Sequence, residues 1–135
     1  ARRELDGLNT MPAQGRFDVD LKPAADAGDP VSRMAIAKTF EGDLIGTSRG
    51  AMLAVRTDTE GSAGYVAIER FEGSLNGKSG GFALQHHGIM DRGAPSLSVQ
   101  VIPDSGSGEL EGIAGTMTID QSSGDHRYSF EYRLP

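Results

Sequence analysis

Hydrophobic and polar residues alternate along most of this chain, which is the pattern of β-strands that bury one face and expose the other. In GRFDVDLK (15–22), Phe17, Val19 and Leu21 share one face, while charged residues occupy the other. No stretch keeps the periodicity of an amphipathic helix. The same reasoning predicts further strands at residues 31–40, 45–57, 65–75, 81–91, 96–102, 113–120 and 126–134. The chain is therefore predicted to be all-β.

Turn segments separate the eight predicted strands. The clearest is NGKSG (76–80), whose Asn-Gly pair is typical of a tight hairpin, and PDSGSGELEG (103–112) is a Gly/Ser-rich connection. Strands joined in sequence order form a meander, and closing the sheet removes its exposed edges. We therefore predict an eight-stranded antiparallel up-and-down barrel over residues 15–135, preceded by a poorly ordered arm at 1–14. A barrel of this size is filled by side chains or holds one small ligand.

The hairpin at residues 76–80 indicates which side chains point into the barrel. A two-residue turn pairs odd positions of strand 65–75 with even positions of strand 81–91, and the more apolar of the two resulting faces is assigned to the interior. Glu69 and His86 belong to that face, and a turn centred on residues 77–78 would place them directly opposite each other. His87 then faces outward. A loop of odd length would instead bring His87 beside Glu69.

Composition narrows the classes of function. The chain has 135 residues, which fits one compact domain, and its formal net charge of −6 argues against nucleic acid and anionic membranes as partners. Cysteine is absent, which excludes disulfides and thiolate chemistry. The basic start lacks the apolar stretch of a signal peptide, and no apolar run approaches a membrane span in length. A cytoplasmic protein is therefore expected.

Glu69 and His86 are the main candidates for chemistry. A carboxylate beside an imidazole can act as a general acid/base couple, although the structural interpretation, in which the two groups satisfy each other, is favoured. Lys38 interrupts an apolar face; it is interpreted as an inward cation for an anionic ligand or, preferably, as a side chain that reaches water. Three tyrosines are interpreted as core aromatics whose hydroxyl groups reach water or, alternatively, as residues that line a pocket with their hydroxyl groups: Tyr65, Tyr128 and Tyr132.

Metal and cofactor motifs give no support for such sites. The three histidines, at positions 86, 87 and 126, fall on different faces or strands, and no H-E-x-x-H motif is present. GSGELEG (106–112) lacks the lysine and the following helix of a phosphate-binding loop. No serine has a G-x-S-x-G context on a strand-to-helix elbow. No metal and no cofactor are therefore expected.

Three motifs carry a resemblance to a known family: KTFEGDLIGTS (38–48), GYVAIERFEGSLNGKSGGFALQHHG (64–88) and SGSGELEGIAGTM (105–117). Through them the chain resembles the bacterial domain-of-unknown-function family 3224. The resemblance implies an avidin-like barrel related in shape to allene oxide cyclase, and it implies no activity. His87 falls at a variable motif position, which favours His86 as the inward histidine. The motif positions on this chain are Lys38, Thr39, Glu69, Arg70, Gln85, His86, Glu109 and Gly115.

Glu109 is expected to have a structural role at the start of the strand predicted at 113–120. A carboxylate there can accept backbone N–H bonds from a glycine turn.

These observations leave three hypotheses for function. The preferred one is a barrel that binds a small hydrophobic or carboxylate-bearing molecule beside Glu69 and His86, with further ligand contacts from Lys38, Tyr65, Arg70, Gln85, Tyr128 and Tyr132. The second is a cofactor-free isomerase, cyclase or lyase in which Glu69 moves a proton and His86 orients or stabilises charge. The third is a filled barrel that self-associates, for example as a homodimer, through an exposed sheet face such as Val66, Ile68 and Ile89.

Overall fold

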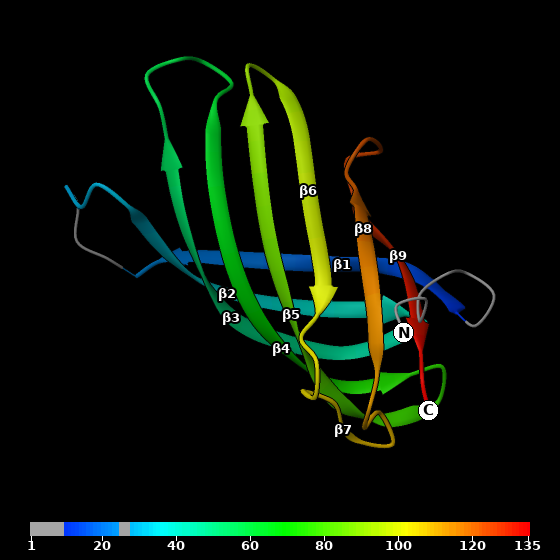
Figure 1. Ribbon diagram of the computed structural model, residues 1–135. Coiled ribbons are helices and arrows are strands. Elements are labelled where there is room, and N and C mark those ends of the chain that lie inside the picture. The colour runs from blue at the N-terminus through cyan, green and yellow to red at the C-terminus, as the bar shows by residue number, and fades with distance from the viewer. Residues whose placement is uncertain (1–9, 25–27) are drawn as a thin grey trace.

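The computed structural model describes residues 10–24 and 28–135, and within them it contains nine β-strands and no helix (Figure 1). No helix able to span a membrane is therefore present among these residues. The strands are β1 (Met11–Pro23), β2 (Ser32–Gly42), β3 (Leu44–Arg56), β4 (Ala63–Leu75), β5 (Lys78–Asp91), β6 (Ala94–Val101), β7 (Ser107–Gly108), β8 (Ala114–Asp120) and β9 (His126–Arg133). The all-β prediction is confirmed.

Eight of these strands close into an antiparallel barrel. The order around it is β4-β3-β2-β1-β9-β8-β6-β5, and pairing of β4 with β5 completes the ring. These eight strands correspond to the eight that the alternation predicts, so the barrel prediction is confirmed. The short strand β7 is an addition, because it lies in the segment predicted as a connection and pairs with Gly80 and Gly81 of β5.

The barrel begins earlier in the chain than expected. β1 starts at Met11, four residues before the expected domain boundary, and pairs with β9 from Met11 opposite Tyr132 onward. Ala13 is buried there. Residues 11–14 of the expected arm are therefore part of the barrel wall, and residues 1–9 of it lie outside the described part of the chain.

The β4–β5 hairpin has a two-residue turn, as the parity argument requires. The turn is Asn76-Gly77, with φ angles of 48° and 86°, so that Leu75 pairs with Lys78. Both angles are positive, which asparagine and glycine tolerate best and which matches the twist of the strands. This register sets His86 opposite Ala67 rather than opposite Glu69. Glu69 and His86 are diagonal neighbours on one face, because the turn is not the one centred on residues 77–78 that would place them directly opposite each other.

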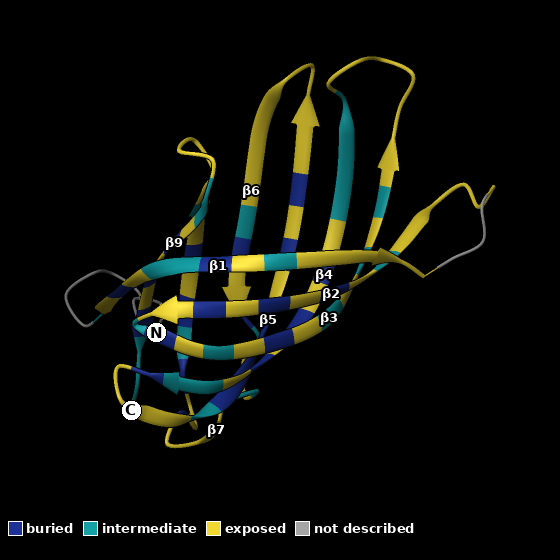
Figure 2. Ribbon diagram, turned by 180° about the vertical axis from the view of Figure 1, so that it is seen from behind, coloured by how far each residue is buried: buried dark blue, intermediate teal, exposed yellow. Residues whose placement is uncertain are grey.

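One half of the barrel is filled by aromatic side chains. Successive rings in the row Phe40, Phe71, Phe82, Phe130 and Tyr132 have centroids 5.2–5.7 Å apart. Leu110 and Ile113, from the segment after β6, are also buried in this core. Figure 2 shows the buried stretches gathered in this half, whereas the far ends of β3–β6 are mostly exposed. The packed half fixes the positions of β2–β5, the strands on which the candidate site lies.

The other half of the barrel is open. β6 and β8 pair only through Val99 opposite Met117 and Gln100 opposite Thr116. Beyond these pairs the two strands separate, and the β3–β6 ends rise above the rest of the barrel (Figure 1). Among the described residues, the packed rings continue into this half only as Phe17 and His126, which line a cavity there.

Candidate functional site

The open half holds two adjoining cavities. The mouth cavity has a volume of about 770 Å³ and is lined mainly by apolar side chains such as Met34, Met90 and Leu97. The inner cavity, of about 130 Å³, lies deeper and is lined in part by Lys38 and His86. Five residues line both cavities and make them continuous: Leu21, Met52, Tyr65, Leu97 and Gln121. Their size and mostly apolar walls are those of a small-molecule site.

Four polar side chains meet at the floor of the inner cavity, one from each of β2–β5. Glu69 is the centre: its Oε2 accepts from Lys38 Nζ at 2.6 Å and contacts His86 Nε2 at 2.5 Å, while Ser48 Oγ donates to its Oε1 at 2.5 Å. All four side chains are buried. They converge because each occupies an inward position of its strand, and the neighbouring strands are in register.

The carboxylate of Glu69 is held in its ionised form. Burial alone would raise its pKa, but the hydrogen bond from His86 and the charges of Lys38 and His86 outweigh burial and lower the pKa to about 2. An ionised carboxylate only accepts hydrogen bonds, so His86 must donate to it through Nε2–H. Glu69 is therefore a fixed anion that orients its neighbours.

His86 and Lys38 keep unused hydrogen-bonding capacity on the cavity side. His86 Nδ1 has no hydrogen-bond partner among the described residues. It is not fully buried either, because the fully buried side-chain nitrogen that lacks a partner in this part of the chain is Nε of Arg133. His86 Nδ1 is therefore accessible from the inner cavity, which His86 lines. Lys38 Nζ donates to Glu69 and lies 4.5 Å from the centroid of the Phe17 ring. Because an ammonium group has three donors, others remain for a ligand.

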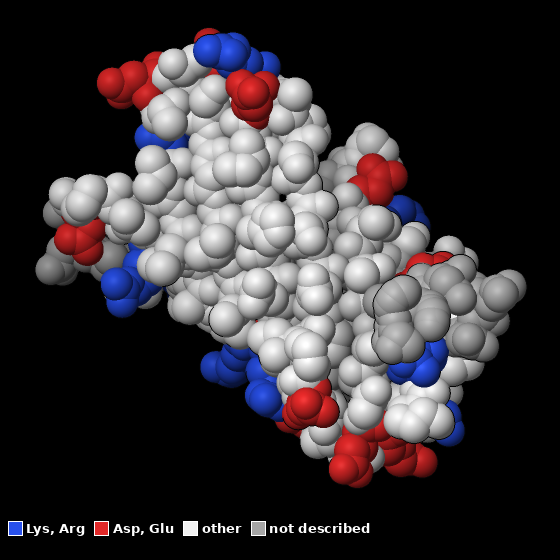
Figure 3. Space-filling model, in the orientation of Figure 1, with Lys and Arg blue, Asp and Glu red and all other residues white. Residues whose placement is uncertain are grey.

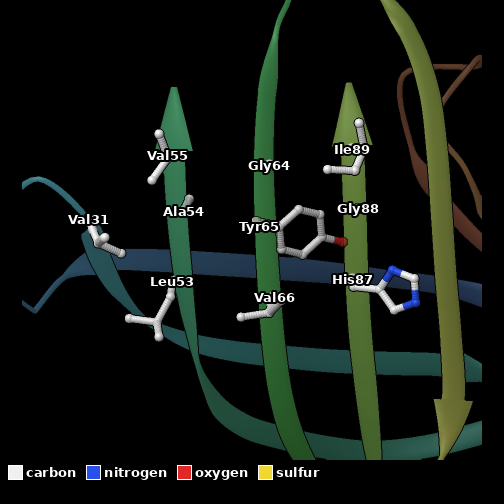
Figure 4. A pocket seen from close by; sticks show the side chains of 10 residues that line it. All are labelled: Val31, Leu53, Ala54, Val55, Gly64, Tyr65, Val66, His87, Gly88 and Ile89. Atoms are coloured by element: carbon white, nitrogen blue, oxygen red, sulfur yellow. The ribbon is translucent and has the colours of Figure 1, made fainter. Parts of the chain in front are cut away.

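Tyr65 lies at the junction of the two cavities. Its ring extends from β4 toward β5 and covers Gly88, where an added Cβ would come within 2.5 Å of the ring (Figure 4). Burial, and secondly the charge of Glu69, raises the pKa of Tyr65. The phenol therefore stays protonated at neutral pH and can donate a hydrogen bond at the junction.

Comparisons with known proteins identify one family. The profile of the family described as a protein of unknown function (DUF3224) matches residues 13–132. A crystal structure from Shewanella oneidensis MR-1, described as a protein with unknown function from the DUF3224 family, is 44% identical, with a TM-score of 0.88 over 93% of this chain and 98% of that one. The chain belongs to the DUF3224 family. No curated protein matches it.

The DUF3224 barrel brings together three of the residues predicted to form a site. Glu69 and His86 both face inward, and they satisfy each other as the structural interpretation predicts. Lys38 joins them, so the preferred prediction that it reaches water is wrong: its side chain is buried against Glu69 because that carboxylate compensates its charge. Tyr65 is near them at the cavity junction.

Four other predicted ligand contacts lie elsewhere in the DUF3224 barrel. Arg70 and Gln85 occupy outward positions of β4 and β5 and are exposed. Tyr128 and Tyr132 are in the filled half, where Tyr128 donates to the Glu41 carbonyl at 3.0 Å and Tyr132 accepts from an asparagine side chain. None of the four lines the mouth cavity or the inner cavity.

Glu109 has the structural role predicted for it. Its Oε1 accepts the backbone N–H of Ser79 at 2.8 Å, and its own N–H donates to the Ser79 carbonyl. These bonds fasten the segment around β7 to the start of β5. Glu109 lines neither the mouth cavity nor the inner cavity and is not part of the site.

Ser48 is the member of the site that the sequence did not reveal. It lies in GTSRG (46–50), which has the letters of a G-x-S-x-G motif but sits inside strand β3 instead of on a strand-to-helix elbow. Its hydroxyl is bonded to Glu69 and not to His86, so the trio is not a nucleophilic triad. Within the described residues, no group of His, Asp and Glu side chains is arranged to hold a metal ion.

Proposed function

We propose that this DUF3224 barrel binds one small, largely apolar molecule in its open half, with the polar head of that molecule at Lys38 and His86. The observation that carries the proposal is the continuity of the mouth cavity with the inner cavity, whose floor holds the charged cluster. Ligand sites generally combine apolar walls with a few convergent polar groups, as here. The packed aromatic half holds these groups in place from below.

The polar groups define the class of ligand head. Lys38 offers N–H donors, and His86 presents Nδ1, which donates a hydrogen bond when the ring is protonated and accepts one when it is neutral. With His86 protonated, the two cations exceed the single charge of Glu69 by one, so the cluster suits an anionic head that accepts hydrogen bonds from both. A carboxylate has this character, and a ketone, which accepts a hydrogen bond without carrying a charge, has it in weaker form. The apolar walls of the mouth cavity suit a hydrocarbon tail or ring.

Decanoate and a methyl ketone of equal length are suitable first probes. A ligand that binds only the folded state stabilises it by mass action, by about 2.7 kcal/mol at a hundredfold excess over Kd. For a domain of this size we expect a saturable rise in melting temperature of roughly 5–10 °C with decanoate, and a smaller rise with the ketone. A wild-type melting temperature that neither probe changes at millimolar concentration would contradict this ligand class.

The adjacent histidines provide a matched pair of variants. His86→Ala is expected to weaken decanoate binding at least tenfold, measured by calorimetry, because it removes a group from the cavity floor. His87→Ala should leave the affinity unchanged, since His87 is exposed on the outer face. Met52→Trp is a second variant that fills the cavity junction and should abolish binding. Equal affinities in all three variants would exclude this site.

Proton-transfer catalysis is a second candidate, and the Glu69–His86 hydrogen bond favours it. A base that works near neutral pH needs a pKa near that range, and Glu69 is too acidic. In the proposed catalytic step, His86 Nδ1 takes a proton from the carbon beside the carbonyl group of the ligand, and Glu69 orients the imidazole ring. Incubation of the methyl ketone in D₂O should then place deuterium beside its carbonyl, and His86→Gln should lower that rate at least a hundredfold. Exchange no faster than in buffer alone would leave only the binding function.

A further inference from the structure

The outer face of β3–β6 has an apolar centre on β3–β5 and polar residues along β6, and the proposed function does not use it. Val66, Ile68 and Ile89 are each more than half exposed on this face, and Leu53 and Val55 extend it across β3. Figure 3 shows the middle of this face free of charged side chains, which gather toward its edges. Figure 4 shows four of these apolar side chains around the shallow hollow at Gly64: Leu53, Val55, Val66 and Ile89. An apolar face of this extent marks an interaction surface.

The extent of the face suits a protein interface. Four strands spaced about 4.8 Å apart, each contributing about nine residues with a rise of about 3.3 Å, cover roughly 20 by 30 Å. That is about 600 Å² from each copy, or about 1,200 Å² in total before side-chain relief is added, which is the lower limit of the area that stable interfaces bury. One copy of this face against another therefore reaches the area that a dimer needs.

The two ends of the face carry opposite charges. Arg49 and Arg70 are opposite each other at one end and are exposed. Asp91 points outward at the other end, with an ion pair of 3.5 Å to the adjacent Arg92, and the neighbouring β3–β4 loop adds two further acidic residues, Asp58 and Glu60. Glu72, the next outward residue of β4, lies beside the two arginines, so the surface is mainly basic at one end, apolar in the middle and mainly acidic at the other end.

The strand register makes this arrangement symmetric about one point. Val66 of β4 pairs with His87 of β5 in the middle of the face. Ile68 and Arg70 follow Val66 at two and four residues toward the basic end, and Ile89 and Asp91 follow His87 at the same intervals toward the acidic end. A two-fold axis that lies in the plane of the face and crosses the strands at the level of Val66 and His87 turns a second copy over onto the first, with its acidic end over the basic end of the first.

We infer that the partner of this face is a second copy of the same chain, docked antiparallel about that axis. Ile68 then packs on Ile89 of the second copy, and Arg70 lies near Asp91 of the second copy. Each such contact occurs twice, as a two-fold interface requires. The net charge of −6 opposes association in general. The uncharged centre and the complementary ends overcome this repulsion on this face alone.

The first test is the mass of the protein in solution. Sedimentation velocity of the full chain at tens of micromolar is expected to give a dimer. Ile68→Glu should raise the dimer dissociation constant at least tenfold, because it places a carboxylate against Ile89 of the second copy. Ile45→Glu is the matched control, since Ile45 is equally exposed on β3 but lies outside the face, and its dimer should be unchanged. A monomeric wild type, or a dimer that Ile68→Glu leaves intact, would overturn the inference.

The second test uses charge reversal to establish the orientation. Arg70→Asp and Asp91→Arg should each weaken the dimer several-fold, and the double variant should recover most of the loss. Within one chain these residues are at opposite ends of the face, so rescue can arise only between copies. Additive weakening in the double variant would overturn the antiparallel arrangement. Ligand binding in the barrel uses the inward face, so its failure and the failure of this interface are separately observable.

Discussion

Glu69→Gln is expected to destabilise the barrel by about 3–5 kcal/mol, because it leaves the buried ammonium group of Lys38 without a counter-charge. His86 loses its anionic acceptor in the same step. Urea unfolding at neutral pH measures the effect. Glu72→Gln is the matched control, three positions along β4 but outward and exposed, and should change stability by less than about 0.5 kcal/mol.

A companion variant separates the charge effect from a loss of packing. Lys38→Met in the Glu69→Gln background removes the unpaired charge and keeps most of the side-chain volume. The double variant should therefore be more stable than Glu69→Gln alone, even though it carries one more substitution. If the two effects simply add, the Lys38–Glu69 pair does not stabilise this barrel through charge compensation.

The same carboxylate should make stability depend on pH. The pKa of Glu69 in the folded protein is about 2, below the value of about 4.3 for an unfolded chain. Its contribution is therefore fully present above about pH 4.3 and is lost as the pH falls toward 2, where the unfolded chain binds the proton more readily than the folded one. In Glu69→Gln the decline between these pH values should be smaller.

The barrel was predictable because its signals are local. Alternation identified the eight long strands, and the Asn76-Gly77 turn fixed which face of β5 points inward, so that His86 rather than His87 was assigned to the interior. Each of these inferences needs only neighbouring residues or one hairpin. β7 escaped prediction because two residues, one of them glycine, show no alternation.

The site was only partly predictable because its members meet across four strands. The role of Lys38 depends on the register of β2, β3 and β4 together. A lysine on an apolar strand face has the same sequence pattern whether or not a buried carboxylate lies beside it in the folded barrel. Ser48 resembles any small strand residue. The open half depends on where β6 and β8 part, which no single segment encodes.

Phe71→Ala is expected to cost about 3–5 kcal/mol of stability, because Phe71 is fully buried between Phe40 and Phe82 and its removal leaves a cavity in the filled half. Its melting temperature should fall by roughly 10–15 °C. Tyr65→Ala, at the junction of the two cavities, should cost less than about 1.5 kcal/mol because that ring is only half-buried.

The affinity for decanoate should rank the two variants in the opposite order. It should be unchanged in Phe71→Ala below the melting temperature of that variant, and at least tenfold weaker in Tyr65→Ala. If Tyr65→Ala destabilised the protein as much as Phe71→Ala did, the open half would belong to the folding core. The opposite ranking of the two variants in stability and in affinity is what a barrel with one packed half and one binding half requires.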